Sequence, residues 1–65
     1  MQRDDPIIEL VRIGHAVRVT AIDPSSLVEV TLQAPAGLDP ATLARAATAK
    51  LRYRLARLPP AGLQT

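Results

Sequence analysis

Side chains suited to acid–base or nucleophilic chemistry are few in this sequence. His15 is the single imidazole, and Asp23, Ser25 and Ser26 stand together. A catalytic triad requires a nucleophile, a base and an orienting acid within hydrogen-bond reach of one another. The predicted strand between His15 and Asp23 spans about 23 Å, so the histidine and the serines lie at its opposite ends. We therefore expect no triad, and we attribute Asp23 and the serines to turn formation.

Metal and cofactor sites are not expected either. A metal site needs several convergent histidine, cysteine or carboxylate ligands, and the sequence has one histidine and no cysteine. Gly14, Gly37 and Gly62 match neither a phosphate-binding loop nor a dinucleotide motif. The sequence thus predicts a protein that is not an enzyme and that holds no cofactor and no metal.

The best candidate for direct chemical recognition is the basic segment 50–57. Its cations are Lys50, Arg52, Arg54 and Arg57. Such a stripe can contact phosphates or an acidic partner, but Tyr53 is the only aromatic residue that could stack on bases. The helix dipole also favours cations near a helix C-terminus, and arginine stems can cover apolar surface. Nucleic-acid binding is therefore the alternative hypothesis rather than the leading one.

Three strands and a helix must position these residues. Apolar and polar residues alternate over Ala16–Ile22 and over residues 28–33, which predicts a β-hairpin around the Asp23-Pro24 turn. A strand at Ile7–Ile13 precedes the hairpin, and Gly14-His15 suits a type II′ turn between them. The third strand is expected over residues 27–34.

A helix is predicted over residues 41–58, because this segment is rich in alanine, leucine and arginine. Asp39 is the expected N-cap, Pro40 suits the first helical position, and Pro59 ends the helix. The fold class is therefore α+β: a three-stranded antiparallel meander with one C-terminal helix packed on one face.

Pairing of Ile13 with Ala16 and of Ile22 with Leu27 sets the expected faces of the sheet. The face toward the helix then carries Ile8, Leu10, Val17, Val19, Ala21, Val28, Val30 and Leu32. The predicted helix carries an apolar stripe that would pack on this face. It consists of Leu43, Ala44, Ala47, Leu51, Leu55 and Leu58. These two surfaces are expected to form the single core.

The opposite face of the sheet is unusually apolar for a solvated surface. Its candidate interface residues are Ile7, Val11, Ile13, Ile22 and Leu27. The sequence has no phenylalanine, tryptophan or cysteine, so its core is small and lacks crosslinks. We therefore expect a non-enzymatic interaction or regulatory module that binds itself or another, unidentified protein. Self-association, most simply as a homodimer, would use this face or an edge strand, and joining two edges would give one sheet of six strands.

The domain is expected to span residues 7–58, with flexible segments at 1–6 and 59–65. The absence of cysteine favours a reducing, cytoplasmic setting. The polar start of the chain does not suit a signal peptide. No apolar run reaches the roughly 18 residues of a membrane helix, so no membrane contact is expected.

The chain resembles a family of short uncharacterised bacterial proteins, mainly alphaproteobacterial, in three segments. These are RIGHAVRVTAIDP at 12–24, Glu29-Val30, and KLRYRLAR at 50–57. The resemblance implies a shared fold and no known activity. It also implies a glycine at the close of the second turn, where this chain has Leu27. Leucine disfavours the left-handed conformation that a glycine would adopt there. The pairing of the second and third strands could therefore be shifted by one residue, which would exchange the two faces of the third strand.

Overall fold

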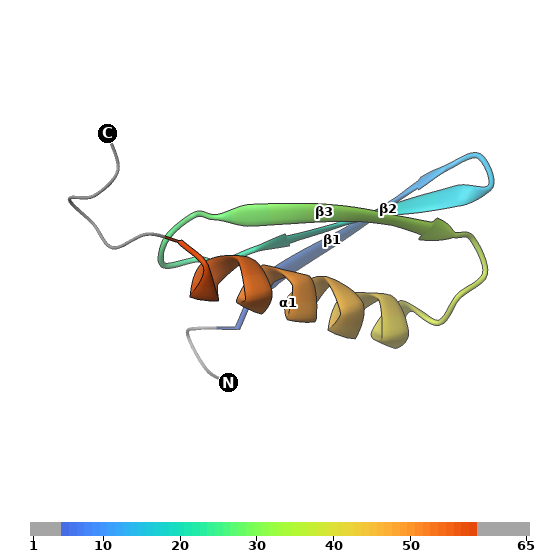
Figure 1. Cartoon of the computed structure of the whole chain (residues 1–65). Coiled ribbons are helices and arrows are strands. Elements are labelled where there is room, and N and C mark those ends of the chain that lie inside the picture. Colours follow the sequence, from blue (N-terminus) through green and yellow to red (C-terminus); the bar gives the residue numbers. More distant parts are fainter. Residues whose placement is uncertain (1–4, 59–65) are drawn as a thin grey trace.

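The computed structural model describes residues 5–58 as three strands followed by one helix (Figure 1). β1 (Ile7–Ile13), β2 (Ala16–Ile22) and β3 (Glu29–Pro35) form an antiparallel sheet in the order β1-β2-β3. α1 (Pro40–Ala56) runs back across one face. The predicted α+β fold is therefore confirmed. The predicted flexible segments lie outside the described residues, apart from Asp5 and Pro6.

The β1–β2 hairpin has the predicted bounds and register. Ile13 pairs with Ala16, Leu10 with Val19, and Ile8 with Ala21. The backbone φ is +62° at Gly14, and His15 has no positive φ. A positive φ at the first central position alone is the requirement of a type II′ turn, which glycine meets without strain. A two-residue turn leaves the strands only one register, and this is why the prediction held.

The β2–β3 register differs from the prediction by two residues. Ile22 pairs with Glu29 rather than with Leu27, and β3 covers Glu29–Pro35 rather than residues 27–34. The connection is longer than predicted because Leu27 adopts the left-handed conformation, with φ of +63°. The Leu27 N–H bonds to the Asp23 carbonyl, and the Asp23 N–H bonds to the Val28 carbonyl, each at 2.8 Å.

A shift of two residues leaves every side chain of β3 on its predicted face, because the side-chain period of a strand is two. Val30 and Leu32 therefore still point toward the helix, opposite Ala21 and Val19 respectively. The exchange of faces that a one-residue shift would cause does not occur.

α1 begins as predicted and ends earlier. The Asp39 carboxylate accepts a hydrogen bond from the Thr42 N–H at 3.3 Å, and Pro40 lies in the first turn. The helix ends at Ala56, not at Leu58, and the Arg57 N–H bonds to the Arg54 carbonyl in a tighter final turn. Leu58 precedes a proline, and proline disfavours the helical conformation in the residue before it.

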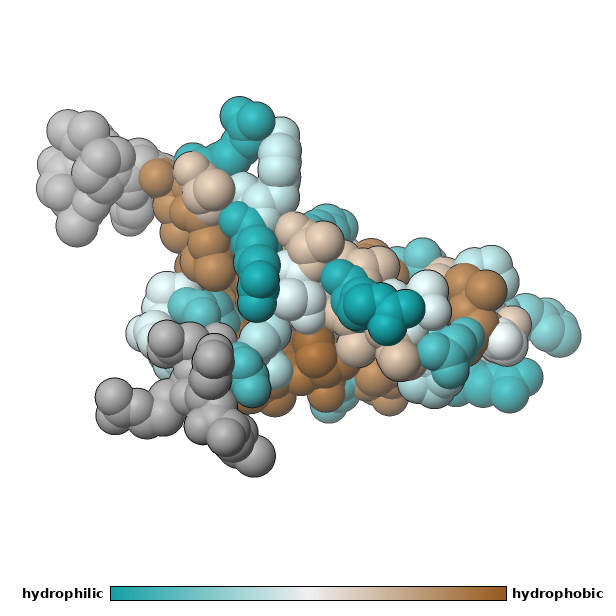
Figure 2. Space-filling view, turned by 90° about the horizontal axis from the view of Figure 1, so that it is seen from below, coloured by the Kyte–Doolittle hydropathy of each residue, from teal (hydrophilic) through white to brown (hydrophobic). Residues whose placement is uncertain are grey.

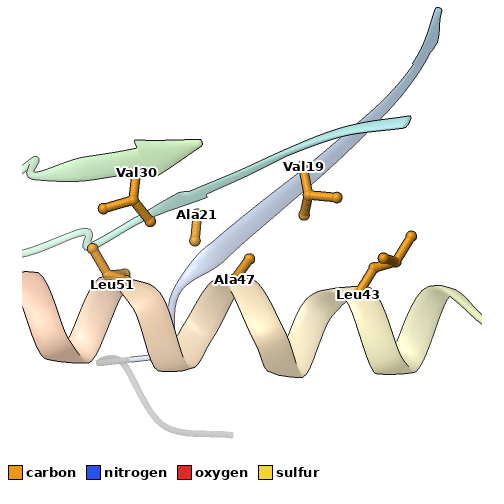
Figure 3. Close-up of a cluster of buried hydrophobic side chains, with 6 residues drawn as sticks. All are labelled: Val19, Ala21, Val30, Leu43, Ala47 and Leu51. Atoms are coloured by element: carbon orange, nitrogen blue, oxygen red, sulfur yellow. The ribbon is translucent and has the colours of Figure 1, made fainter. Parts of the chain in front are cut away.

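The core lies between α1 and the two strands β2 and β3 (Figure 3). Its buried side chains are Val19, Ala21, Val30, Leu43, Ala47 and Leu51. Six partly buried residues pack around them: Ile8, Val17, Val28, Leu32, Ala34 and Leu55. The three buried helix positions follow at intervals of four residues, as expected for one face of an amphipathic helix. All six buried side chains are aliphatic.

Candidate interaction surface

β1 is the least covered element of the sheet. α1 packs on β2 and β3, and its contacts with β1 are sparse at most. Ile7, Leu10 and Ile13 are 55%, 40% and 50% exposed. Leu10 was predicted to belong to the core; it does lie on the helix side of the sheet, but α1 does not reach far enough across to bury it. Seen from the helix side, apolar surface lies beside hydrophilic side chains (Figure 2).

On the opposite face, the register arranges the predicted interface residues in rows across the strands. Ile7 and Ile22 share a row at one end of the sheet with Glu29. Ile13 shares a row at the other end with Ala16 and Pro35. The rows between them are mainly polar, and consist of Glu9, Thr20 and Thr31, then Val11, Arg18 and Gln33. The apolar surface of this face is therefore divided into two patches at opposite ends.

The predicted interface residues differ in exposure and placement. Ile7 and Ile13 are exposed, whereas Val11 and Ile22 are partly buried. Leu27 does not lie on the sheet at all: it closes the β2–β3 loop, with its side chain 75% exposed. Its assignment to the third strand was wrong for the reason given above, the longer loop.

The hydrogen bonds that flank the β2–β3 ladder identify the free backbone groups of β1. The Asp23 N–H donates to Val28 and the Ala36 N–H donates to His15, so the odd-numbered residues of β2 bond to β3. Peptide groups alternate in direction along a strand, so the even-numbered residues of β2 bond to odd-numbered residues of β1. The N–H and C=O groups of Ile8, Leu10 and Arg12 therefore point away from the sheet.

The free edge of β3 is partly blocked. By the same alternation, the peptide groups of β3 that point outward are those of Glu29, Thr31, Gln33 and Pro35. Nζ of Lys50 donates a hydrogen bond of 2.6 Å to the Thr31 carbonyl, and Pro35 has no N–H to offer. Lysine and proline at a sheet edge hinder the addition of another strand. No comparable bond to Ile8, Leu10 or Arg12 occurs among residues 5–58.

The four predicted basic residues do not form a single surface. Lys50 is bonded to β3, and the guanidinium of Arg57 lies 4.5 Å above the centre of the Tyr53 ring. Arg54 is exposed in the last turn of α1. Arg52 lies on the other flank of the helix, where it borders a shallow depression of about 390 Å³. Ala44, Arg45, Thr48 and Ala49 also line that depression.

The remaining chemical candidates serve local structure. The Asp23 carboxylate accepts hydrogen bonds from the backbone N–H and the hydroxyl of Ser26, at 3.0 and 2.7 Å. The Ser26 hydroxyl oxygen in turn accepts the Val28 N–H at 3.2 Å. His15 lies at the opposite end of β2. Residues 5–58 contain no group of three or more potential metal ligands. Across the same residues, no helix has the length and apolarity needed to traverse a bilayer.

Comparison with models of known protein families assigns this βββα unit to one family. The family model for a domain of unknown function (DUF6898) matches residues 3–58. The match covers most of the sequence, so the chain belongs to this family. No match was found among curated proteins, and none among solved structures.

Proposed function

We propose that this protein is a small, non-enzymatic interaction or regulatory module that acts by self-association, most simply as a homodimer. The observation that carries this proposal is the uncovered β1, with large apolar side chains exposed at Ile7, Leu10 and Ile13. Exposed apolar side chains gathered on one element favour an interaction surface over a solvated one. The lack of cysteine supports a cytoplasmic place of action.

The small core supports the same proposal. Leu51 and Val19 are its largest fully buried side chains. The chain has no cysteine for a disulfide, and its one large aromatic residue, Tyr53, is 62% exposed and adds little buried area. For a chain of this length, hydrophobic burial at roughly 25 cal/mol per Å² is nearly cancelled by roughly 1.5 kcal/mol of lost entropy per ordered residue. Burial of further apolar surface between subunits would shift that balance toward the folded state.

Multi-angle light scattering of the purified chain, over a concentration series, tests this proposal. We expect the mass of a dimer at micromolar concentration and a shift toward the 7.0 kDa monomer on dilution. Circular dichroism at each end of the series shows whether the dissociated chain is still folded. A stable, folded monomer at every concentration would overturn the proposal.

Nucleic-acid binding by Lys50, Arg52, Arg54 and Arg57 is the alternative, and it is the less well supported. A titration of generic DNA and RNA at about 50 mM salt, where phosphate contacts are strong, separates the two. We expect no salt-dependent binding. Saturable binding that weakens with salt and is lost in an Arg54→Ala, Arg57→Ala double variant would favour the alternative.

A further inference from the structure

We propose that β1 pairs antiparallel with β1 of a second copy, about a two-fold axis at Leu10, to form a continuous six-stranded sheet. This inference rests on the proposed self-association and assigns it to one edge and one register. Its starting observation is that the two edges of the sheet are not equivalent. The β1 edge offers three N–H and three C=O groups, from Ile8, Leu10 and Arg12. The β3 edge is obstructed by Lys50 and Pro35.

A two-fold axis at Leu10 uses all the free groups of β1. Leu10 lies opposite Leu10 of the partner subunit, and Ile8 lies opposite Arg12 of the partner subunit. Each such pair exchanges two hydrogen bonds, so every outward N–H and C=O of the strand gains a partner. The axis is perpendicular to the sheet, so both helices lie on the same face and flank the paired β1 strands.

Registers displaced by two residues are less favourable. A shift in one direction places Glu9 directly opposite Glu9 of the partner subunit, and like charges in that position destabilise a sheet. A shift in the other direction places Ile8 opposite Gly14 of the partner subunit, where the hairpin turn ends the ladder. The register at Leu10 avoids both problems.

The side chains on the two faces also favour a second copy of this chain as the occupant. On the outer face, Ile7 lies opposite Ile13 of the partner subunit, so the separate apolar patches at the two ends of each sheet meet across the junction. On the helix face, the two Leu10 side chains lie side by side, and the aliphatic stem of Arg12 covers Ile8 of the partner subunit. The exposed surface of β1 is thus complementary to the same surface of a second copy related by the two-fold axis.

Proline substitutions at the two edges test this inference. The outward N–H groups of Leu10 and Gln33 take no part in the sheet of one subunit, so Leu10→Pro and its matched control Gln33→Pro each block one edge and keep the internal ladder. We expect Leu10→Pro to raise the dimer dissociation constant by on the order of 30–100-fold, because two hydrogen bonds are lost at the axis. Gln33→Pro should leave the dissociation constant within about threefold of the native value.

Sedimentation velocity measures both variants, and circular dichroism verifies that each is folded. Leu10→Glu provides a second variant without a proline, and it should also weaken the dimer, since it places two carboxylates against each other at the axis. Unchanged dimers for Leu10→Pro and Leu10→Glu would overturn the β1 pairing while self-association stands. Loss of the dimer only in Gln33→Pro would place the contact on β3. A monomeric native chain would overturn the proposed function itself.

Discussion

Leu27 occupies a backbone conformation that glycine adopts far more readily. Its φ is +63°, and its side chain is 75% exposed, so little burial compensates for the strain. For a residue with a Cβ the left-handed region costs roughly 1–2 kcal/mol. The loop keeps this conformation because the Asp23 carboxylate and the Ser26 hydroxyl fix the turn before it.

Replacement of Leu27 by glycine should therefore stabilise the protein. We expect Leu27→Gly to raise the free energy of unfolding by roughly 0.5–1 kcal/mol, the relief of strain being partly offset by the greater freedom of glycine in the unfolded chain. Chemical denaturation at one fixed protein concentration measures the change. The matched control is Leu27→Ala, which removes the side chain and keeps the strain. An increase with alanine equal to that with glycine would contradict the explanation by backbone strain.

The two-residue turn made the register of the β1–β2 hairpin predictable. For the longer β2–β3 loop, the alternating pattern was not sufficient to predict the register. Gly14-His15 leaves one pairing for Ile7–Ile13 with Ala16–Ile22, and the structure has that pairing. The loop after Asp23 gave no comparable signal, because a leucine at its left-handed position conceals the extra length. The faces were nevertheless right, because the register differs from the prediction by two residues, which is the side-chain period of a strand.

The lateral position of α1 could not be predicted from its apolar stripe. Leu43, Ala47 and Leu51 indicate which side of the helix is buried, but not over which strands it lies. The exposure of Leu10 and the open edge of β1 follow from that position. Lys50 was read only as a possible contact for phosphate or an acidic partner. Its place beside the apolar stripe indicates that it lies near the sheet, but its bond to Thr31 depends on the lateral position of α1.

At the scale of elements, the contact between α1 and β3 keeps that edge closed. We expect Lys50→Ala to change stability little, because the bond to the Thr31 carbonyl is exposed. It should instead increase the fraction of species larger than a dimer, since pairing through β1 leaves the two β3 strands as the outer edges of the sheet. Analytical ultracentrifugation reports the size distribution. Arg52→Ala removes the same charge from the other flank of α1 and should not aggregate; equal aggregation of both variants would implicate net charge instead.

At the scale of the whole molecule, one helix covers two of three strands, and a core of six aliphatic residues supports the fold. β1 keeps apolar side chains at the surface, and its outward peptide groups have no partner among residues 5–58. Pairing of β1 with β1 of a second copy would supply both a hydrogen-bonding partner and apolar cover.

Amide hydrogen exchange on the unmodified chain tests the β1 pairing most directly. The N–H groups of Ile8, Leu10 and Arg12 should be protected at high protein concentration and should lose protection on dilution, because a second copy would offer them the acceptors that residues 5–58 do not. The N–H groups of Glu29, Thr31 and Gln33 on the other edge should exchange rapidly throughout. Rapid exchange of the three β1 amides at every concentration, in a folded protein, would contradict the account.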